Sequence, residues 1–189
     1  MKRLFAASLL SLSLLSSVQA ADYTIDTENM HAGITFRIKH LGYSWLYGRF
    51  NDFSGNFSYD PAKPDDAKVE VSIKTTSVDS NHAERDKHLR SKDFLDVEKF
   101  PEAKFVSKSF KRNADGTGAL EGDFTLHGVT KPLKIDVKEI GGGKDPWGGE
   151  RLGFEGNAAF ALADYGISYD LGAASKTVEL LLSVEGIKK

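Results

Sequence analysis

The feature that most constrains the fold of this chain is an alternation of apolar and polar residues that recurs along most of its length. In residues 34–40, and again in residues 68–74, an apolar side chain occupies almost every second position. This period of two is typical of a half-buried strand, because successive side chains of a strand point to opposite faces of the sheet. Similar segments follow at 48–59, 105–110, 120–126, 133–138, 154–162 and 178–185. The sequence therefore predicts an all-β protein with about eight strands.

Turn-forming residues separate these segments. Glycine, proline, asparagine and aspartate cluster at 60–64, 113–116, 127–132 and 141–149. Within residues 48–59 the spacing of the phenylalanines changes phase between Phe50 and Phe53, which predicts a β-bulge near Asp52. No linker, internal repeat or low-complexity stretch interrupts the pattern, so we expect one domain. About eight strands in one domain fit either a closed antiparallel barrel or a two-sheet sandwich.

One charge-dense segment, residues 81–94, breaks the strand pattern. Asn81 followed by Glu84 three positions later is typical of a helix N-terminus, where the two side chains cap backbone N–H groups. The apolar residues near it are few, mainly Leu89, Phe94 and Leu95. We therefore predict a single short helix that lies on the surface.

The N-terminus has the layout of a secretory signal peptide. Lys2 and Arg3 precede an apolar stretch, residues 4–15, that is too short to span a bilayer. Val18 and Ala20 then supply the small residues that precede a cleavage site. We predict a signal peptide over residues 1–20, cleavage after Ala20, and one exported domain over residues 21–189.

Composition argues against several classes of partner. The chain contains no cysteine, so no disulfide stabilises the fold. Loss of Lys2 and Arg3 with the signal peptide changes the formal net charge from −2 to −4, which argues against binding of nucleic acid or an anionic surface. The polar face of most strands carries lysine, glutamate and aspartate, which argues against stable insertion in a membrane as an outer-membrane barrel.

Five groups of residues carry a resemblance to a known family. They are Phe36-x-Ile38-Lys39-His40-Leu41-Gly42 with Gly48-x-Phe50, Arg85-Asp86-x-His88-Leu89-Arg90-Ser91-x-Asp93-Phe94, Phe100-Pro101, Gly122-Asp123-Phe124-Thr125-Leu126-x-Gly128-Val129-Thr130-Lys131-Pro132, and Asp164-Tyr165-Gly166-Ile167. In these segments, which follow one another at compatible spacing along essentially all of residues 21–189, the chain resembles the YceI-like family.

The resemblance implies a lipocalin-like, eight-stranded antiparallel barrel with one short surface helix. It also implies a periplasmic protein with a long pocket. This pocket takes a polyisoprenoid or a similar long-chain lipid, for example a polyprenyl chain or a quinone. We expect no other cofactor. We therefore expect the ligand to contact apolar strand residues and polar residues near the barrel mouth. These are Phe36, His40, Tyr43, Trp45, Phe50, Phe57, Phe94, Phe105, Phe124, Leu126, Phe154 and Leu182.

The residues themselves leave the role of this interior open. Eight strands close a barrel whose interior is either packed solid or holds one small ligand. His40 shares the inward phase of Ile34 and Phe36, and it is either a core histidine or a contact for a ligand headgroup. Tyr43 and Trp45 follow at once, and their amphipathic rings suit an entrance that is wet on one side.

The charged segment contains metal-ligand residue types, but their spacing argues against a metal site. His82 and His88 are six positions apart, which places them about 240° apart around a helix. They therefore cannot bind one ion from the same face. Arg85 and Asp86 are expected to pair locally or to attach the helix to the barrel.

The main alternative to a lipid-binding protein is an enzyme, namely a small secreted hydrolase. Ser44, His31 or His40, and Asp26 supply the residue types of a catalytic triad. Leu46, however, stands where a nucleophile elbow has its second glycine, and the strand-turn-helix context is missing. We therefore expect no enzyme activity and favour a lipid carrier over a secreted hydrolase or a stress-related barrel with a solid core. The sequence leaves the formation of a homodimer open.

Overall fold

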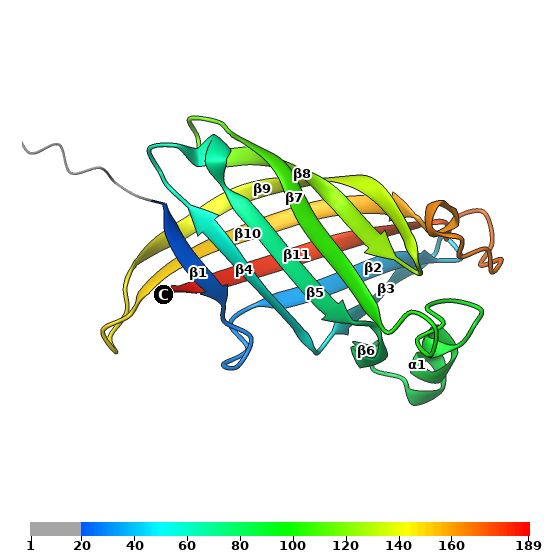
Figure 1. Cartoon of the computed structure of the whole chain (residues 1–189). Coiled ribbons are helices and arrows are strands. Elements are labelled where there is room, and N and C mark those ends of the chain that lie inside the picture. The colour runs from blue at the N-terminus through cyan, green and yellow to red at the C-terminus, as the bar shows by residue number, and fades with distance from the viewer. Residues whose placement is uncertain (1–19) are drawn as a thin grey trace, which may run out of the picture.

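The strands form one antiparallel sheet that closes into a barrel (Figure 1). The structure is a computed structural model that describes residues 20–189, so the predicted signal peptide, apart from Ala20, lies outside the described residues. The strands are β1 (Ala21–Ile25), β2 (Gly33–His40), β3 (Ser44–Phe50), β4 (Phe53–Tyr59), β5 (Lys68–Lys74), β6 (Val78–Asp79), β7 (Glu102–Arg112), β8 (Thr117–Leu126), β9 (Val129–Lys144), β10 (Glu150–Ala161) and β11 (Thr177–Lys188).

Three of the eight barrel strands are interrupted, which is why eleven segments make eight strands. β1 continues as β2, β3 continues as β4, and β5 continues as β6, and each pair occupies one position around the barrel. β11 closes the barrel by pairing with β2 along its first half and with β1 along its second half. The predicted all-β class and the eight-stranded antiparallel barrel are therefore confirmed.

The phase change within residues 48–59 appears as the break between β3 and β4. Only Asn51 and Asp52 separate the two segments. Phe50 lies opposite Val78, whereas Phe53 lies opposite Ile73 on the preceding part of the same neighbouring strand. The irregularity predicted near Asp52 is confirmed.

The strand bounds differ from the sequence analysis in several places: two short strands were missed, β7 to β11 are all longer than predicted, and β9 begins at Val129, within the predicted turn 127–132. β1 and the two-residue β6 were not predicted, because segments this short show too few alternations to detect. β9 and β10 are longer than predicted, so that Gly142 pairs with Leu152 and Gly143 pairs with Arg151. The glycine-rich loop is thereby reduced to residues 145–149, since pairing through backbone hydrogen bonds needs no side chain.

The predicted helix is present as α1 (Ala83–Arg90), but its cap differs. His82 is the N-cap, and its Nδ1 accepts a hydrogen bond from the backbone N–H of Arg85 at 3.3 Å. Asn81 instead adopts a left-handed conformation with a φ of 61° in the turn before the helix. The prediction of Asn81 as the cap was wrong, because an imidazole acceptor one position later replaces it.

Two glycines explain how large rings fit inside the barrel. Gly48 on β3 lies directly opposite Phe36 on β2, and a Cβ atom at Gly48 would lie 2.2 Å from the Phe36 ring. A Cβ atom at Gly122 would similarly lie 2.6 Å from the ring of Phe105. These glycines therefore give space to neighbouring aromatic rings. The pairing of β9 and β10 shifts register beside Gly153. Gly153 lies opposite Gly141 and Phe154 lies opposite Glu139, so Ile140 of β9 is the extra residue of a bulge.

The connections divide the barrel into two ends. The β2–β3 turn, the β8–β9 turn, α1 and the connection from β10 to β11 lie at one end, on the right of Figure 1. The β9–β10 loop and the C-terminus lie at the other. Among the described residues, no helix has the length and apolarity that a membrane span requires.

Candidate functional site

The barrel encloses a cavity of about 720 Å³ whose lining is mainly apolar. This volume lies within the ~300–1,000 Å³ that is usual for pockets that bind small molecules. Residues from every long strand line it, because the inward position of each strand is apolar. Ten of the twelve residues predicted to contact a ligand line this cavity: Phe36, His40, Phe50, Phe57, Phe94, Phe105, Phe124, Leu126, Phe154 and Leu182.

The other two predicted residues, Tyr43 and Trp45, do not line the cavity. Trp45 lies opposite Lys39 on β2, and its ring lies 4.2 Å from the guanidinium carbon of Arg37 on the outer face of the barrel. Tyr43 is 87% exposed. The prediction that these two rings line the rim of the cavity was wrong. On β3 the side chains of Leu46 and Phe50 point into the barrel, so the side chain of Trp45, at an alternate position, points outward.

Polar groups line the cavity mainly at the end that carries α1. His40, at the end of β2, is exposed to solvent and also lines the cavity, so it lies at the mouth rather than in the core. Ser175, from the β10–β11 connection, donates a hydrogen bond to the carbonyl oxygen of Lys39 at 2.5 Å and accepts one from the N–H of Leu41 at 3.3 Å. This serine therefore fixes the connection against the end of β2.

A cluster of rings at the same mouth was not predicted as a unit. The ring of His88 on α1 lies 4.9 Å from the Phe94 ring and 5.1 Å from the Tyr169 ring. Asp93 Oδ2 lies 2.9 Å from His88 Nε2 and so orients the imidazole. His88, Phe94 and Tyr169 all line the cavity. Tyr169 belongs to an irregular connection, where no periodicity in the sequence indicates which side chains turn inward.

Arg85 and Asp86 hold the start of α1 through Ser80. Asp86 is buried and accepts hydrogen bonds from the N–H of Ser80 at 2.7 Å and from its Oγ at 2.5 Å. Arg85 donates to Ser80 Oγ at 2.7 Å and to the Ser80 carbonyl oxygen at 2.6 Å. Ser80 directly follows β6, so these contacts connect the helix to the barrel. Arg85 also lines the cavity.

We predict that Asp86→Ala lowers the free energy of unfolding by about 1–3 kcal/mol, because it leaves the buried N–H of Ser80 without an acceptor. Urea unfolding measures this loss. Asp86→Asn retains an acceptor oxygen and should be less destabilised, while both variants keep bound lipid. Equal stability of Asp86→Ala and the wild type would show that the helix is not held through Ser80.

The residues proposed for a metal site or a catalytic triad are engaged elsewhere or lie far apart. His82 caps α1 and His88 pairs with Asp93. Ser44 lies opposite His40, at the far end of β2 from His31. The seven steps from Gly33 to His40 amount to about 23 Å at the rise of a strand. Ser44 therefore cannot react with the His31–Asp26 pair. His40 lies opposite Ser44 but at the end of β2 that is far from Asp26, so the triad with His40 does not assemble either.

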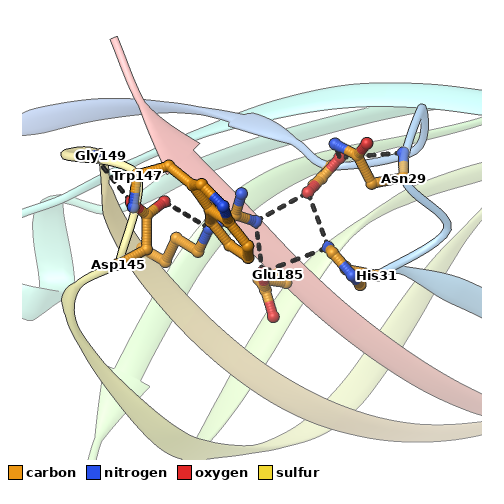
Figure 2. A network of polar contacts seen from close by, with 8 residues as sticks. Asn29, His31, Asp145, Trp147, Gly149 and Glu185 are labelled. Carbon is orange, nitrogen blue, oxygen red and sulfur yellow. Dashed lines mark hydrogen bonds and ion pairs between the residues drawn. The ribbon is translucent and has the colours of Figure 1, made fainter.

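His31 and Asp26 instead belong to a polar network on the outside of the barrel (Figure 2). Asp26 Oδ2 lies 3.0 Å from His31 Nδ1 and accepts a hydrogen bond from Arg151 at 2.7 Å. Arg151 also donates to Glu185 at 2.5 Å and to Asp145 at 2.8 Å. Asp26, His31 and Glu185 place potential ligand atoms within 4.8 Å of one another, but the guanidinium of Arg151 already lies between the two carboxylates.

This network controls the ionisation of a buried acid. Burial alone would raise the pKa of Asp26, but hydrogen bonds from Arg151, His31 and Asn29 outweigh burial and hold the pKa well below its ordinary value. Hydrogen bonds to Asp26, Asp145 and Glu185 raise the pKa of Arg151. The arrangement ties the β1–β2 connection, the β9–β10 loop, β10 and β11 together, which is a structural role.

The sequence profile described as the YceI-like domain matches residues 23–186. The chain belongs to the YceI-like family. A UPF0312 protein of Pseudomonas aeruginosa is 59% identical over 191 residues, which cover 100% of both chains.

Two solved structures relate this YceI-like chain to known barrels. The Campylobacter jejuni YCEI protein is 31% identical, with a TM-score of 0.72 over 80% of this chain and 90% of that chain. A polyisoprenoid binding domain from Saccharophagus degradans has a TM-score of 0.66 over 90% of this chain and 100% of that domain. At 15% identity, the second likeness shows the fold alone.

Proposed function

We propose that this protein is an exported carrier that encloses a long isoprenoid chain, or a related long-chain lipid, inside its barrel. The observation that carries the proposal is the cavity of about 720 Å³, which is lined mainly by apolar side chains contributed from all around the barrel. The YceI-like family and the described activity of the Saccharophagus degradans domain, polyisoprenoid binding, support a binding protein over an enzyme.

The energetics identify which parts of the cavity decide the choice of ligand. Burial of one methylene away from water contributes about 0.8 kcal/mol, so a long chain strongly prefers the cavity to water. The same chain is already dry in a bilayer, however. Transfer from membrane to barrel therefore depends on smaller differences, namely the fit of the chain and the contacts of its headgroup. His40, Arg85, His88 and Ser175 are polar groups at the mouth that can make such contacts.

Uptake from vesicles tests the proposal directly. Protein freed of lipid is mixed with vesicles that contain a long-chain isoprenoid, separated from them, and extracted for mass spectrometry. We expect recovery of about one chain per barrel, since the cavity of about 720 Å³ has the volume of one ligand site. Protein that returns from the vesicles without lipid would contradict the carrier function.

His40→Ala should change the mixture of lipids that is taken up, with a smaller change in their total amount. The imidazole lies at the mouth, where it contacts the headgroup rather than the chain. Mass spectrometry after exposure to mixed vesicles measures both quantities. His82→Ala is a suitable control, because His82 caps α1 and does not line the cavity. An unchanged mixture in His40→Ala would remove His40 from headgroup selection.

Export to the periplasm is part of the proposal and rests on Lys2, Arg3, residues 4–15 and the small residues up to Ala20. Protein sequencing of material from the envelope fraction should find a chain that begins at Ala21. Intact Met1 on protein from the cytosol would contradict export.

A further inference from the structure

The outer face of the β2–β3 hairpin carries exposed aromatic rings that have no role in the cavity. Tyr43, in the turn, and Trp45 and Tyr47, on β3, occupy alternate positions and do not line the cavity. Tyr43 is 87% exposed and Tyr47 is also exposed, while Trp45 is half-buried. Large exposed rings grouped on one surface commonly mark a site of interaction.

Cations accompany these rings. Lys39 lies opposite Trp45 and Arg37 lies opposite Tyr47 in the ladder between β2 and β3. Arg37 is neutralised by Glu179 at 2.7 Å. Lys39 Nζ lies 5.6 Å from the centre of the Trp45 ring, and within the described part of the chain no carboxylate pairs with it. The hairpin thus presents one free positive charge among aromatic rings.

This surface is continuous with the mouth of the cavity. Leu41 lies in the turn with a φ of 52°, a conformation that bulky residues rarely adopt. Leu41 is 56% exposed, yet it also lines the cavity. Tyr169, from the β10–β11 connection, lines the cavity too. A Cβ atom at Gly172, in the β10–β11 connection, would lie 3.8 Å from Leu41 Cδ2. Leu41 therefore belongs both to the outside of the hairpin and to the lining of the cavity.

We propose that this hairpin patch, made of Lys39, Leu41, Tyr43, Trp45 and Tyr47, docks on the surface of a phospholipid bilayer and holds the cavity mouth there. Tyrosine and tryptophan favour the boundary between headgroups and acyl chains, and lysine pairs with anionic headgroups. The inference rests on the proposed function, because a mouth placed on the membrane lets a long chain enter the barrel without exposure to water.

The same chemistry disfavours a second copy of the chain as the partner. In a two-fold contact the patch would meet itself, which would bring the two Lys39 charges together. The net charge of the chain from Ala21 onwards is negative and disfavours an anionic surface for the molecule as a whole. On this face, however, the local charge is that of Lys39, which a bilayer with anionic headgroups complements.

The opposite end of the barrel supplies a matched control. Trp147 is 77% exposed, but its ring lies 5.7 Å from the guanidinium carbon of Arg151 and lines no part of the cavity. Removal of this indole therefore changes exposed aromatic surface without touching the mouth.

Flotation with vesicles tests the docking surface. The mature protein is mixed with vesicles of phosphatidylcholine alone, or of phosphatidylcholine with phosphatidylglycerol, and the bound fraction is measured. The double variant Tyr43→Ser, Tyr47→Ser, which changes no residue that lines the cavity, should partition about tenfold less onto either vesicle, because two exposed rings that contact the bilayer are lost. Trp147→Ser should match the wild type. Lys39→Glu should weaken binding only to vesicles with phosphatidylglycerol.

Lipid uptake provides the second measurement. The double variant should take up an isoprenoid from vesicles more slowly, yet reach the same final amount, because its cavity is intact. Equal flotation of the double variant and the wild type would overturn the docking proposal. So would a wild-type dimer in light scattering that becomes a monomer in the double variant. Flotation that depends on the patch, together with no uptake of lipid, would support docking and contradict the carrier function.

Discussion

Arg151→Met is expected to lower the Tm by roughly 10 °C, because it removes the cation that neutralises Asp26. The carboxylate of Asp26 is 2% exposed, and burial of such a charge without its partner costs about 3 kcal/mol. Differential scanning calorimetry at neutral pH measures the change.

The pH dependence separates this cause from a general loss of packing. In the wild type the pKa of Asp26 is lowered, so its contribution to stability is present above the ordinary pKa of an aspartate and is lost as the pH falls through the lowered value. In Arg151→Met the favourable hydrogen bond is gone and burial still raises this pKa. The difference in Tm should therefore be greatest near neutral pH and shrink as the pH falls towards about 4.

Arg49→Met is the matched control, because Arg49 forms an exposed ion pair with Asp79 at 3.5 Å. Exposed pairs contribute little, so its Tm should remain almost unchanged. A difference between Arg151→Met and the wild type that does not vary with pH would contradict the role assigned to Asp26.

Leu182→Arg should lower the amount of lipid recovered with the protein at least tenfold, because it places an unpaired charge in the channel for the chain. Leu182 lines the cavity and is only partly buried, so the longer side chain has space to enter it. Extraction with organic solvent and mass spectrometry, normalised to folded protein by circular dichroism, measures the loss.

Leu181→Arg is the control for this substitution. Leu181 is the neighbouring residue on β11, lies opposite Asn157, and does not line the cavity. The same change of residue type on the outer face should leave lipid recovery near that of the wild type. Equal loss in the two variants would show that a charge on β11, rather than a charge in the cavity, causes the effect.

The fold was predictable because its signal is local. Phe36 and Ile38 on β2 alternate with Thr35 and Arg37, and each strand repeats this pattern without reference to the rest of the chain. The break at Asp52 was predictable for the same reason. The identity of the helix cap was not, because Asn81 and His82 both offer an acceptor, and only the backbone conformation decides between them.

The site was predictable only where it follows strand phase. Phe124 and Leu182 were placed correctly in the lining, since inward positions of a closed barrel must face one another. Tyr43 and Trp45 were misplaced because they were assigned by chemistry, not by their phase on β3. The volume of the cavity depends on how side chains from all strands pack together, and Tyr169 reaches it from an irregular connection. Neither the volume of the cavity nor the position of Tyr169 produces a periodic pattern in the sequence.

The Asp26 network shows the same limit more clearly. Asp26 and Arg151 are 125 positions apart, and no local pattern marks either residue. They meet because β1 and β10 both pair with β11, which only the closed topology reveals.

Extraction of the wild-type protein itself tests the central claim most directly. The protein is purified from its own envelope fraction without detergent, extracted with organic solvent, and the extract is analysed by mass spectrometry. We predict that a long-chain isoprenoid lipid is recovered in near-stoichiometric amount from the wild type and is depleted in Leu182→Arg. An extract free of lipid, from protein that also takes up none from isoprenoid-containing vesicles, would contradict the account and would indicate that the barrel does not serve as a carrier.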